Sequence, residues 1–257
     1  MAEGVPPAAP QGEWGAGTIG IHADAPSPPG TGSADDVPPS SGGTSMRWSH
    51  SQDVAAPIGV TTTFESVEGG HIYSRQSNPT RDRCECVLAA LEATPGATTT
   101  PSALLYSSGL AAVHAILVAL LPETKRIAIS GGYHGTHQVL DILKEIRPSL
   151  EIIQLPPVQE ADTVLQEGDV VWLETPRNPM CEVYDIAAYS CLGCQPKVVV
   201  DSTFAPPPIQ RCLALGATAV MHSTTKYLAG HSDALGEPGT AALPCLPSVE
   251  MQPGRCL

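Results

Sequence analysis

The stretch Lys197-Val-Val-Val-Asp201 is the clearest strand of this sequence, and it carries a carboxylate at its end. Similar short apolar runs recur along the chain, separated by segments with helical periodicity. We expect further strands at 126–130, 151–155, 170–174 and 218–222, and helices at 84–93, 110–121 and 137–146. Strands that alternate with helices predict βαβ units. The sequence therefore indicates an α/β fold with a mainly parallel sheet that is covered on both faces.

Two segments qualify this pattern. The helix at 110–121 is apolar nearly all round, which predicts that it is buried. A crossover helix is needed between Ile186 and Pro196, but Gly193 and Pro196 make this stretch a poor helix.

Composition and charge limit the possible functions. The chain has 257 residues, of which 42% are hydrophobic, so it is long enough to bury a sizeable core. A formal net charge of -13 argues against nucleic acid or an anionic membrane as a partner. No apolar run is long enough for a transmembrane helix, and the N-terminus lacks the features of a secretory signal. These observations favour a cytoplasmic protein.

The cysteines are expected to be free thiols. Cys191-x-x-Cys194 has the spacing of half a zinc site or of a redox pair, but no second CxxC or HxxxH accompanies it. Ordinary thiols are therefore favoured over a Cys-rich metal-binding module, and no metal ligands are predicted.

Chemically useful side chains follow the predicted strands. Tyr133 lies in the Gly-rich segment after the strand at 126–130, Asn178 follows the strand at 170–174, and Asp201 ends its own strand. Ser223, Thr225 and Lys226 follow the last strand. Because ligands bind at the carboxyl ends of strands in open α/β sheets, we expect these groups to converge on one edge.

Each group has a plausible role around a pyridine-ring cofactor. A lysine amine forms a Schiff base with an aldehyde, and burial makes such an amine nucleophilic by lowering its pKa. A carboxylate such as Asp201 keeps a ring nitrogen protonated, and Tyr133 can stack on the ring. The segment Ser107-Ser-Gly109-Leu110 precedes a helix and predicts an anion site. Taken singly, each residue is better explained by an ordinary cap, turn, packing or surface role, and only their joint placement at strand ends favours a site.

Four ordered motifs resemble those of the Cys/Met metabolism enzymes that depend on pyridoxal 5'-phosphate (PLP), the family of cystathionine gamma-synthase, beta-lyase and gamma-lyase. Ser223-Thr-Thr-Lys226-Tyr-Leu-Ala-Gly-His-Ser-Asp233 resembles the family's lysine motif. Tyr73-Ser-Arg75-x-x-Asn78-Pro-Thr80 resembles YxRxxNPT, Ser107-Ser-Gly-Leu-Ala-Ala112 resembles SSGMAA, and Val200-Asp201-Ser-Thr-Phe204-Ala resembles VDNTFA. The resemblance covers about residues 53–236.

The resemblance implies a role for each residue. Lys226 is the Schiff-base lysine and proton shuttle, Asp201 pairs with the pyridine nitrogen, and Tyr133 stacks on the ring, so Lys226 and Tyr133 are the expected catalytic residues. Asn178 lies near the cofactor's 3-oxygen. The residues that bind the phosphate are Gly109, Leu110, Ser223 and Thr225, joined by Tyr73 and Arg75 from a neighbouring subunit.

The resemblance also implies an organisation. We expect the large domain of an aspartate-aminotransferase-like (fold type I) enzyme that works as a homodimer or homotetramer on an amino-acid substrate. The expected reaction is elimination or replacement at Cβ or Cγ of a sulfur-containing or O-acylated amino acid. The resemblance implies an arm at 46–82 and the PLP-binding domain at 83–236, while composition predicts a disordered Pro/Gly/Ser-rich tail at 1–45 and an aperiodic tail at 237–257.

The sequence departs from the family's pattern in three places. The stretch Tyr189–Pro196 is shorter than the family's helix there and does not resemble it. Asn178-Pro-Met-Cys181 replaces the usual NPTG, and residues 237–257 do not resemble the family's smaller C-terminal domain, which supplies the arginine for the substrate carboxylate. We therefore expect that domain to be missing, as in a shifted frame or a mis-spliced end. The alternative to a transsulfuration enzyme is a truncated, non-catalytic homologue that binds PLP or dimerises without turnover.

Overall fold

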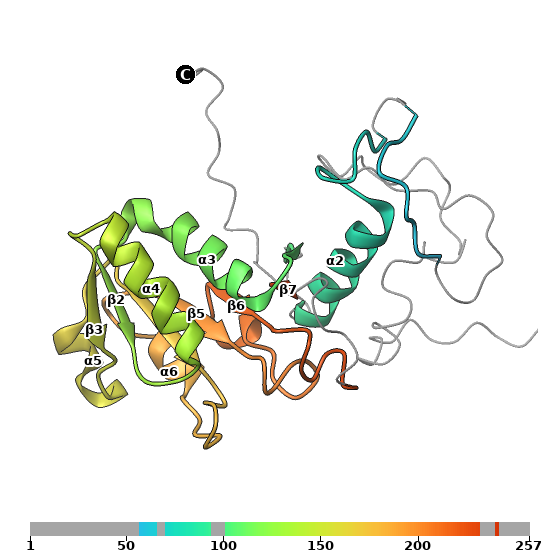
Figure 1. Cartoon of the computed structure of the whole chain (residues 1–257). Helices are drawn as coiled ribbons and strands as arrows, with labels where there is room; N and C mark the ends of the chain where they lie inside the picture. Colours follow the sequence, from blue (N-terminus) through green and yellow to red (C-terminus); the bar gives the residue numbers. More distant parts are fainter. Residues whose placement is uncertain (1–56, 66–69, 94–100, 232–239, 242–257) are drawn as a thin grey trace, which may run out of the picture.

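A five-stranded parallel sheet forms the centre of the computed structural model, which describes residues 57–65, 70–93, 101–231 and 240–241 (Figure 1). The strand order is β3-β2-β4-β5-β6. The strands are β2 (Arg126–Ile129), β3 (Glu151–Gln154), β4 (Val170–Glu174), β5 (Lys197–Asp201) and β6 (Ala219–Met221). The α/β fold with a parallel sheet is thus confirmed. Strands β4 and β5 have the predicted bounds, and the others are slightly shorter than predicted.

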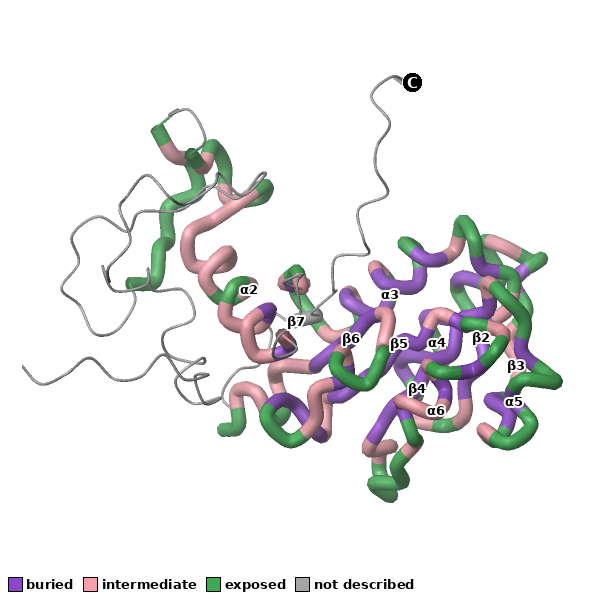
Figure 2. The backbone as a smooth tube through the Cα atoms, turned by 180° about the vertical axis from the view of Figure 1, so that it is seen from behind, coloured by how far each residue is buried: buried purple, intermediate pink, exposed green. Residues whose placement is uncertain are grey.

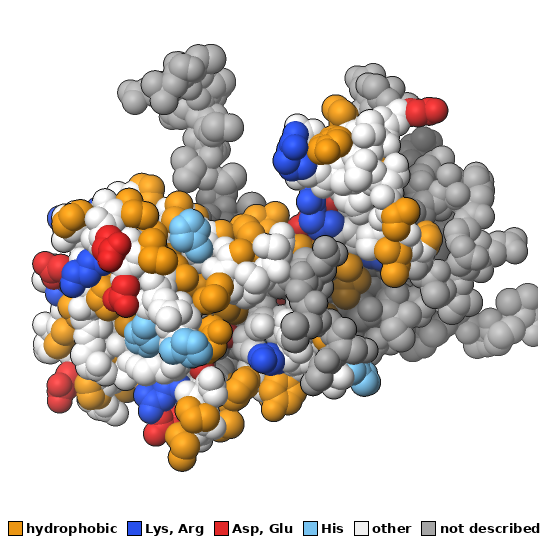
Figure 3. Space-filling model, in the orientation of Figure 1, with side chains coloured by type: hydrophobic (Ala, Val, Ile, Leu, Met, Phe, Trp, Pro, Cys, Tyr) orange, Lys and Arg blue, Asp and Glu red, His pale blue; other side chains and the backbone are white. Residues whose placement is uncertain are grey.

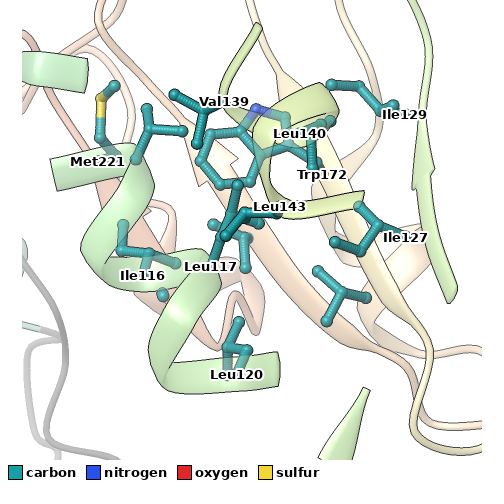
Figure 4. Close-up of a cluster of buried hydrophobic side chains, with 14 of the residues drawn as sticks. Ile116, Leu117, Leu120, Ile127, Ile129, Val139, Leu140, Leu143, Trp172 and Met221 are labelled. Carbon is teal, nitrogen blue, oxygen red and sulfur yellow. The ribbon is translucent and has the colours of Figure 1, made fainter. Parts of the chain in front are cut away.

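Helices cover both faces of this sheet, because alternate residues of each strand point to opposite sides. Val170 and Trp172 pack with α3 (Gly109–Leu120) and α4 (His134–Ile146) in one core cluster. Val171 and Leu173 belong to a second cluster with α5 (Val158–Val164) and α6 (Ile186–Ser190). Figure 4 shows the first cluster, where the indole of Trp172 lies beside Val139, Leu140 and Leu143.

Helix α3 departs from the predicted complete burial. Ser108 caps its N-terminus by accepting a hydrogen bond from the N–H of Ala111 at 3.1 Å. Leu117 is 1% exposed, whereas the neighbouring Val118 is 43% exposed. The expectation of a helix buried all round is therefore wrong for the described part of the chain, where only one side of α3 packs against the sheet and α4.

The crossover before β5 is a single short helix. Helix α6 spans Ile186–Ser190, begins at Asp185, whose side chain accepts from the N–H of Ala188, and ends before Gly193. The weak helical signal at 189–196 therefore marks the loop after a short helix, in which Gln195 adopts a positive φ of 49°. Helix α5 follows Pro157 and was not among the predicted elements.

Helix α2 (Pro79–Glu92) projects from the body of the molecule (Figure 1). It begins earlier than the predicted residue 84, because the side chain of Asn78 caps it by accepting from the N–H groups of Thr80 and Arg81. In Figure 2 most of α2 has intermediate burial, and its buried residues are Ala89 and Glu92 near the C-terminal end. A small antiparallel pair, β1 (Leu104–Leu105) and β7 (Thr240–Ala241), lies beside it.

The proposed tails at 1–45 and 237–257 lie outside the described residues, apart from the two residues of β7. The expected arm is described at 57–65 and from residue 70 onward. Among the helices of the described ranges, none combines the length and apolar character that crossing a membrane requires.

The two neighbouring residues of α3 test the packing of the core. We expect Leu117→Ala to lower the free energy of unfolding by about 3 kcal/mol, because it leaves a cavity between α3 and the sheet. Val118→Ala, one position along on the exposed side, should change it by less than about 0.5 kcal/mol. Urea unfolding followed by circular dichroism measures both, and equal losses would contradict this packing.

Candidate functional site

A cavity of about 780 Å³ lies at the carboxyl edge of the sheet, where β4, β5 and β6 end. It is lined by residues from five separate segments of the chain, which the strand order brings together. All the predicted site residues except Tyr73 and Arg75 line this cavity: Gly109, Leu110, Tyr133, Asn178, Asp201, Ser223, Thr225 and Lys226. The convergence expected from strand ends is therefore found in the structure.

Asp201 ends β5 in a buried position, 4% exposed. Its Oδ1 accepts hydrogen bonds from the N–H of Thr203 at 3.0 Å and from its hydroxyl at 2.6 Å. No described residue donates to Oδ2, which leaves this oxygen for a donor on a ligand. Burial raises the pKa of Asp201 to about 6, against the lowering effect of the Thr203 hydroxyl, and the charge of Glu174 raises it further.

The same threonine connects the carboxylate to the segment that carries the lysine. The Thr203 hydroxyl oxygen accepts a hydrogen bond from the N–H of Ser223 at 2.9 Å. A turn follows, closed by the N–H of Lys226 donating to the Ser223 carbonyl at 3.1 Å. The Thr203 side chain thus fixes the position of Asp201 relative to the turn that carries Lys226.

The start of α3 faces this turn. A Cβ built on Gly109 would lie 3.4 Å from the Cβ of Ser223, so the helix N-terminus and the turn are in contact. The N–H groups of Gly109 and Leu110 belong to the first turn, before intrahelical acceptors exist. Together with the hydroxyls of Ser223 and Thr225, they form a donor set suited to a phosphate.

Lys226 lies at the rim of the cavity, where its side chain is exposed in the described part of the chain. Tyr133 on the opposite loop is also 37% exposed. The residues described around Lys226 thus leave its side of the cavity open.

Two buried acids near the site carried no recognisable sequence signal. Glu174 lines the cavity, and its carboxylate accepts from the N–H groups of Tyr133 and Asn178. Glu92 of α2 lies 2.6 Å from Nε2 of His222, and both side chains are almost fully buried. His222 directly precedes Ser223, so this pair joins α2 to the strand that leads to Lys226. Apolar periodicity does not reveal such long-range partners.

Tyr73 and Arg75 lie on the projecting part of the molecule instead. The Arg75 guanidinium sits over the Tyr73 ring, 4.8 Å from its centroid. Tyr73 is 38% exposed and forms an isolated antiparallel bridge with Thr63. Figure 3 shows Lys/Arg and hydrophobic side chains on the surface of this part, away from the sheet. The two residues are thus not brought to the cavity of their own chain.

Cys191 is exposed, Cys194 is half-buried, and both are free thiols. Burial raises the pKa of Cys194, and the nearby Asp162 raises it further. Within the ranges that the structure describes, no three His, Cys, Asp or Glu side chains are grouped to hold a metal ion.

Asp201→Asn tests the cost of the buried carboxylate. Because the pKa of Asp201 is raised from 3.8 to about 6, the folded state binds more protons than the unfolded state between these values, and stability falls as the pH rises through them. Without ligand, the Asn variant should be more stable at pH 8 by roughly 3 kcal/mol, and by roughly half of that at pH 5. Urea unfolding at both pH values measures this. A variant no more stable than the wild type at pH 8 would contradict it.

Comparisons with known proteins agree on one family. The family model for the Cys/Met metabolism PLP-dependent enzymes matches residues 21–242. The chain is 38% identical over 197 residues to a cystathionine gamma-synthase of Mycobacterium tuberculosis, covering 71% of this chain and 48% of that protein. It is 36% identical over 198 residues to a putative cystathionine gamma-lyase 2 of Caenorhabditis elegans, covering 73% and 49%.

Solved structures show the same fold. The crystal structure of metB from Corynebacterium glutamicum superimposes with a TM-score of 0.68 at 31% identity, covering 90% of this chain and 55% of that one. The cystathione gamma lyase CalE6 from Micromonospora echinospora gives 0.66 at 30% identity, covering 90% and 56%. The chain spans about half the length of the curated relatives that it matches. This chain belongs to the family of Cys/Met metabolism PLP-dependent enzymes.

Proposed function

We propose that this chain supplies the PLP site of a transsulfuration enzyme, with Lys226 as the residue that binds the cofactor covalently. The observation that carries the proposal is one cavity lined by an amine, a buried carboxylate and a helix N-terminus. The substrate is a sulfur-containing or O-acylated amino acid, and the reaction is an elimination or replacement at Cβ or Cγ, as in the synthases and lyases that this chain resembles.

The donor set of the cavity fits PLP. Asp201 offers an oxygen that no described residue occupies, which suits a protonated ring nitrogen. The first N–H groups of α3, with Ser223 and Thr225, suit the phosphate. Tyr133 lines the cavity, where it would stack on the ring, and Asn178 lies on the loop after β4, where it would contact the 3-oxygen.

Asp201, Lys226 and Tyr133 have different roles in the proposed reaction. When bound, PLP supplies an electron sink that stabilises negative charge at the substrate Cα. Asp201, ionised above a pH of about 6, holds the ring-nitrogen proton in place. The Lys226 amine removes the Cα proton and returns protons later in the reaction. Tyr133 fixes the plane of the ring against which this transfer occurs.

A neighbouring subunit completes the site in this proposal. Tyr73 and Arg75 lie on a projecting segment, with the guanidinium stacked on the phenol ring and both side chains exposed. A cation presented in this way suits the phosphate of another copy of the chain. We therefore propose a homodimer, or a homotetramer built from such dimers.

The exposure of Lys226 and Tyr133 keeps one alternative function open. In that alternative, the chain binds PLP or dimerises but does not turn over substrate. The two functions differ in product formation and not in cofactor binding, so one set of measurements separates them.

Lys226→Ala tests the central role. The wild-type chain with PLP should show a visible absorption band that the variant lacks, and any release of thiol or 2-oxoacid should fall on the order of 10²–10⁴-fold. Lys144→Ala, an exposed lysine on α4, is the matched control and should keep both. A wild-type chain without the band would refute the PLP site, and a band without product would favour the non-catalytic alternative.

Mixed subunits test the arm. Arg75→Ala should weaken PLP binding about tenfold, because a charge-assisted contact to the phosphate is lost. Co-expression of Arg75→Ala with Lys226→Ala chains creates mixed dimers, in which one of the two sites has both native residues. Because roughly half of the dimers are mixed, roughly a quarter of all sites are native. At limiting PLP, roughly a quarter of the wild-type band should therefore return. If the band is only the sum of the two separate variants, Arg75 does not act across subunits.

A further inference from the structure

Strand β4 ends in Glu174, a buried carboxylate at 8% exposure that lines the cavity. One oxygen, Oε2, accepts a hydrogen bond from the backbone N–H of Tyr133 at 2.6 Å. The other, Oε1, accepts from the backbone N–H of Asn178 at 2.7 Å. A single side chain thus fixes two loops, the one after β2 and the one after β4.

The loop that carries Tyr133 is seated directly on this carboxylate. Gly132 has a φ of +89°, and a Cβ added there would lie 2.4 Å from Oε2 of Glu174. Gly131 has a φ of +59°, and a Cβ there would lie 3.0 Å from Nη1 of Arg177. Any side chain at Gly132 would therefore displace either the loop or the carboxylate, and Arg177 packs against the same loop at Gly131.

Glu174 and Asp201 are direct neighbours in the β4–β5 ladder, yet their oxygens are used differently. Both oxygens of Glu174 are occupied by backbone donors. Asp201 is bound by Thr203 at Oδ1 only, among the described residues. Because each oxygen of Glu174 holds a backbone N–H of a different loop, its geometry suits holding the site, whereas that of Asp201 suits contacting a ligand.

We propose that Glu174 is a positioning residue that sets the Tyr133 ring and the Asn178 side chain at a fixed place relative to Asp201. The effect on PLP rests on the proposed function. The two hydrogen bonds by which Glu174 holds the loops are a property of the chain without ligand. A carboxylate suits this role because the two N–H donors approach different oxygens of the same group. An amide offers one oxygen, and its NH₂ group would face the second donor.

Hydrogen–deuterium exchange in the full chain without PLP tests whether Glu174 holds the two loops. Glu174→Gln should speed amide exchange at least about tenfold in the peptides that contain Tyr133 or Asn178, because one loop loses its acceptor. Peptides from β2, β4 and α3 should be unchanged. Glu145→Gln, an exposed residue of α4 with the same change of charge, is the control. Unchanged exchange at both loops in Glu174→Gln would overturn the proposal.

Titration with PLP tests whether the loops held by Glu174 contribute to cofactor binding. Glu174→Gln should raise the Kd for PLP about tenfold and change the visible circular dichroism of the bound cofactor, which reports the placement of the ring. An unchanged Kd and dichroism beside faster loop exchange would also overturn the positioning role. If Glu174→Gln does not fold, Glu174→Asp replaces it, since a side chain one methylene shorter cannot reach both donors.

The two proposals fail in different ways. If the wild-type chain binds no PLP, the proposed function is wrong, while the exchange experiment still decides whether Glu174 fixes the two loops. If the wild-type chain binds PLP and Glu174→Gln exchanges and binds like the wild type, the function stands and the positioning role is wrong.

Discussion

The parallel pairing of β4 with β5 is the constraint on which the rest of the site depends. It aligns Glu174 with Asp201 at the carboxyl edge of the sheet, so two buried carboxylates end neighbouring strands. Their mutual repulsion is tolerated because each is hydrogen-bonded, Glu174 to two backbone donors and Asp201 to Thr203. The loops that follow these strands are therefore tied to the carboxylates and not only to each other.

The ionised carboxylate of Asp201 lowers the stability of the folded chain. Burial raises the pKa of Asp201, and the neighbouring Glu174 raises it further, so the ionised form is held against an unfavourable environment. In the proposed site, a cationic ring nitrogen on a ligand would offset that cost, because it would pair with the ionised carboxylate. Glu92 of α2 and His222 form a second pair of buried polar groups. It connects the projecting helix with the strand that leads to Lys226.

Much of the fold could be predicted because its signals are local. The apolar runs of β4 and β5 gave their bounds, and the chemistry of the residues after each strand located the cavity. Three features could not be predicted in this way. The exposure of Lys226 depends on what covers the cavity, the one-sided burial of α3 depends on its neighbours, and the brevity of α6 depends on how Asp185 and the following loop pack.

The sequence by itself determined the α/β class, the family motifs and eight of the residues that line the cavity, because strand ends and short motifs are formed by neighbouring positions. Only the tertiary structure decided which oxygen atoms are free. Glu174 and the N–H of Tyr133 are 41 residues apart, and Glu92 and His222 are 130 apart. Such contacts follow from the order of strands in the sheet and from where α2 docks, which no local pattern encodes.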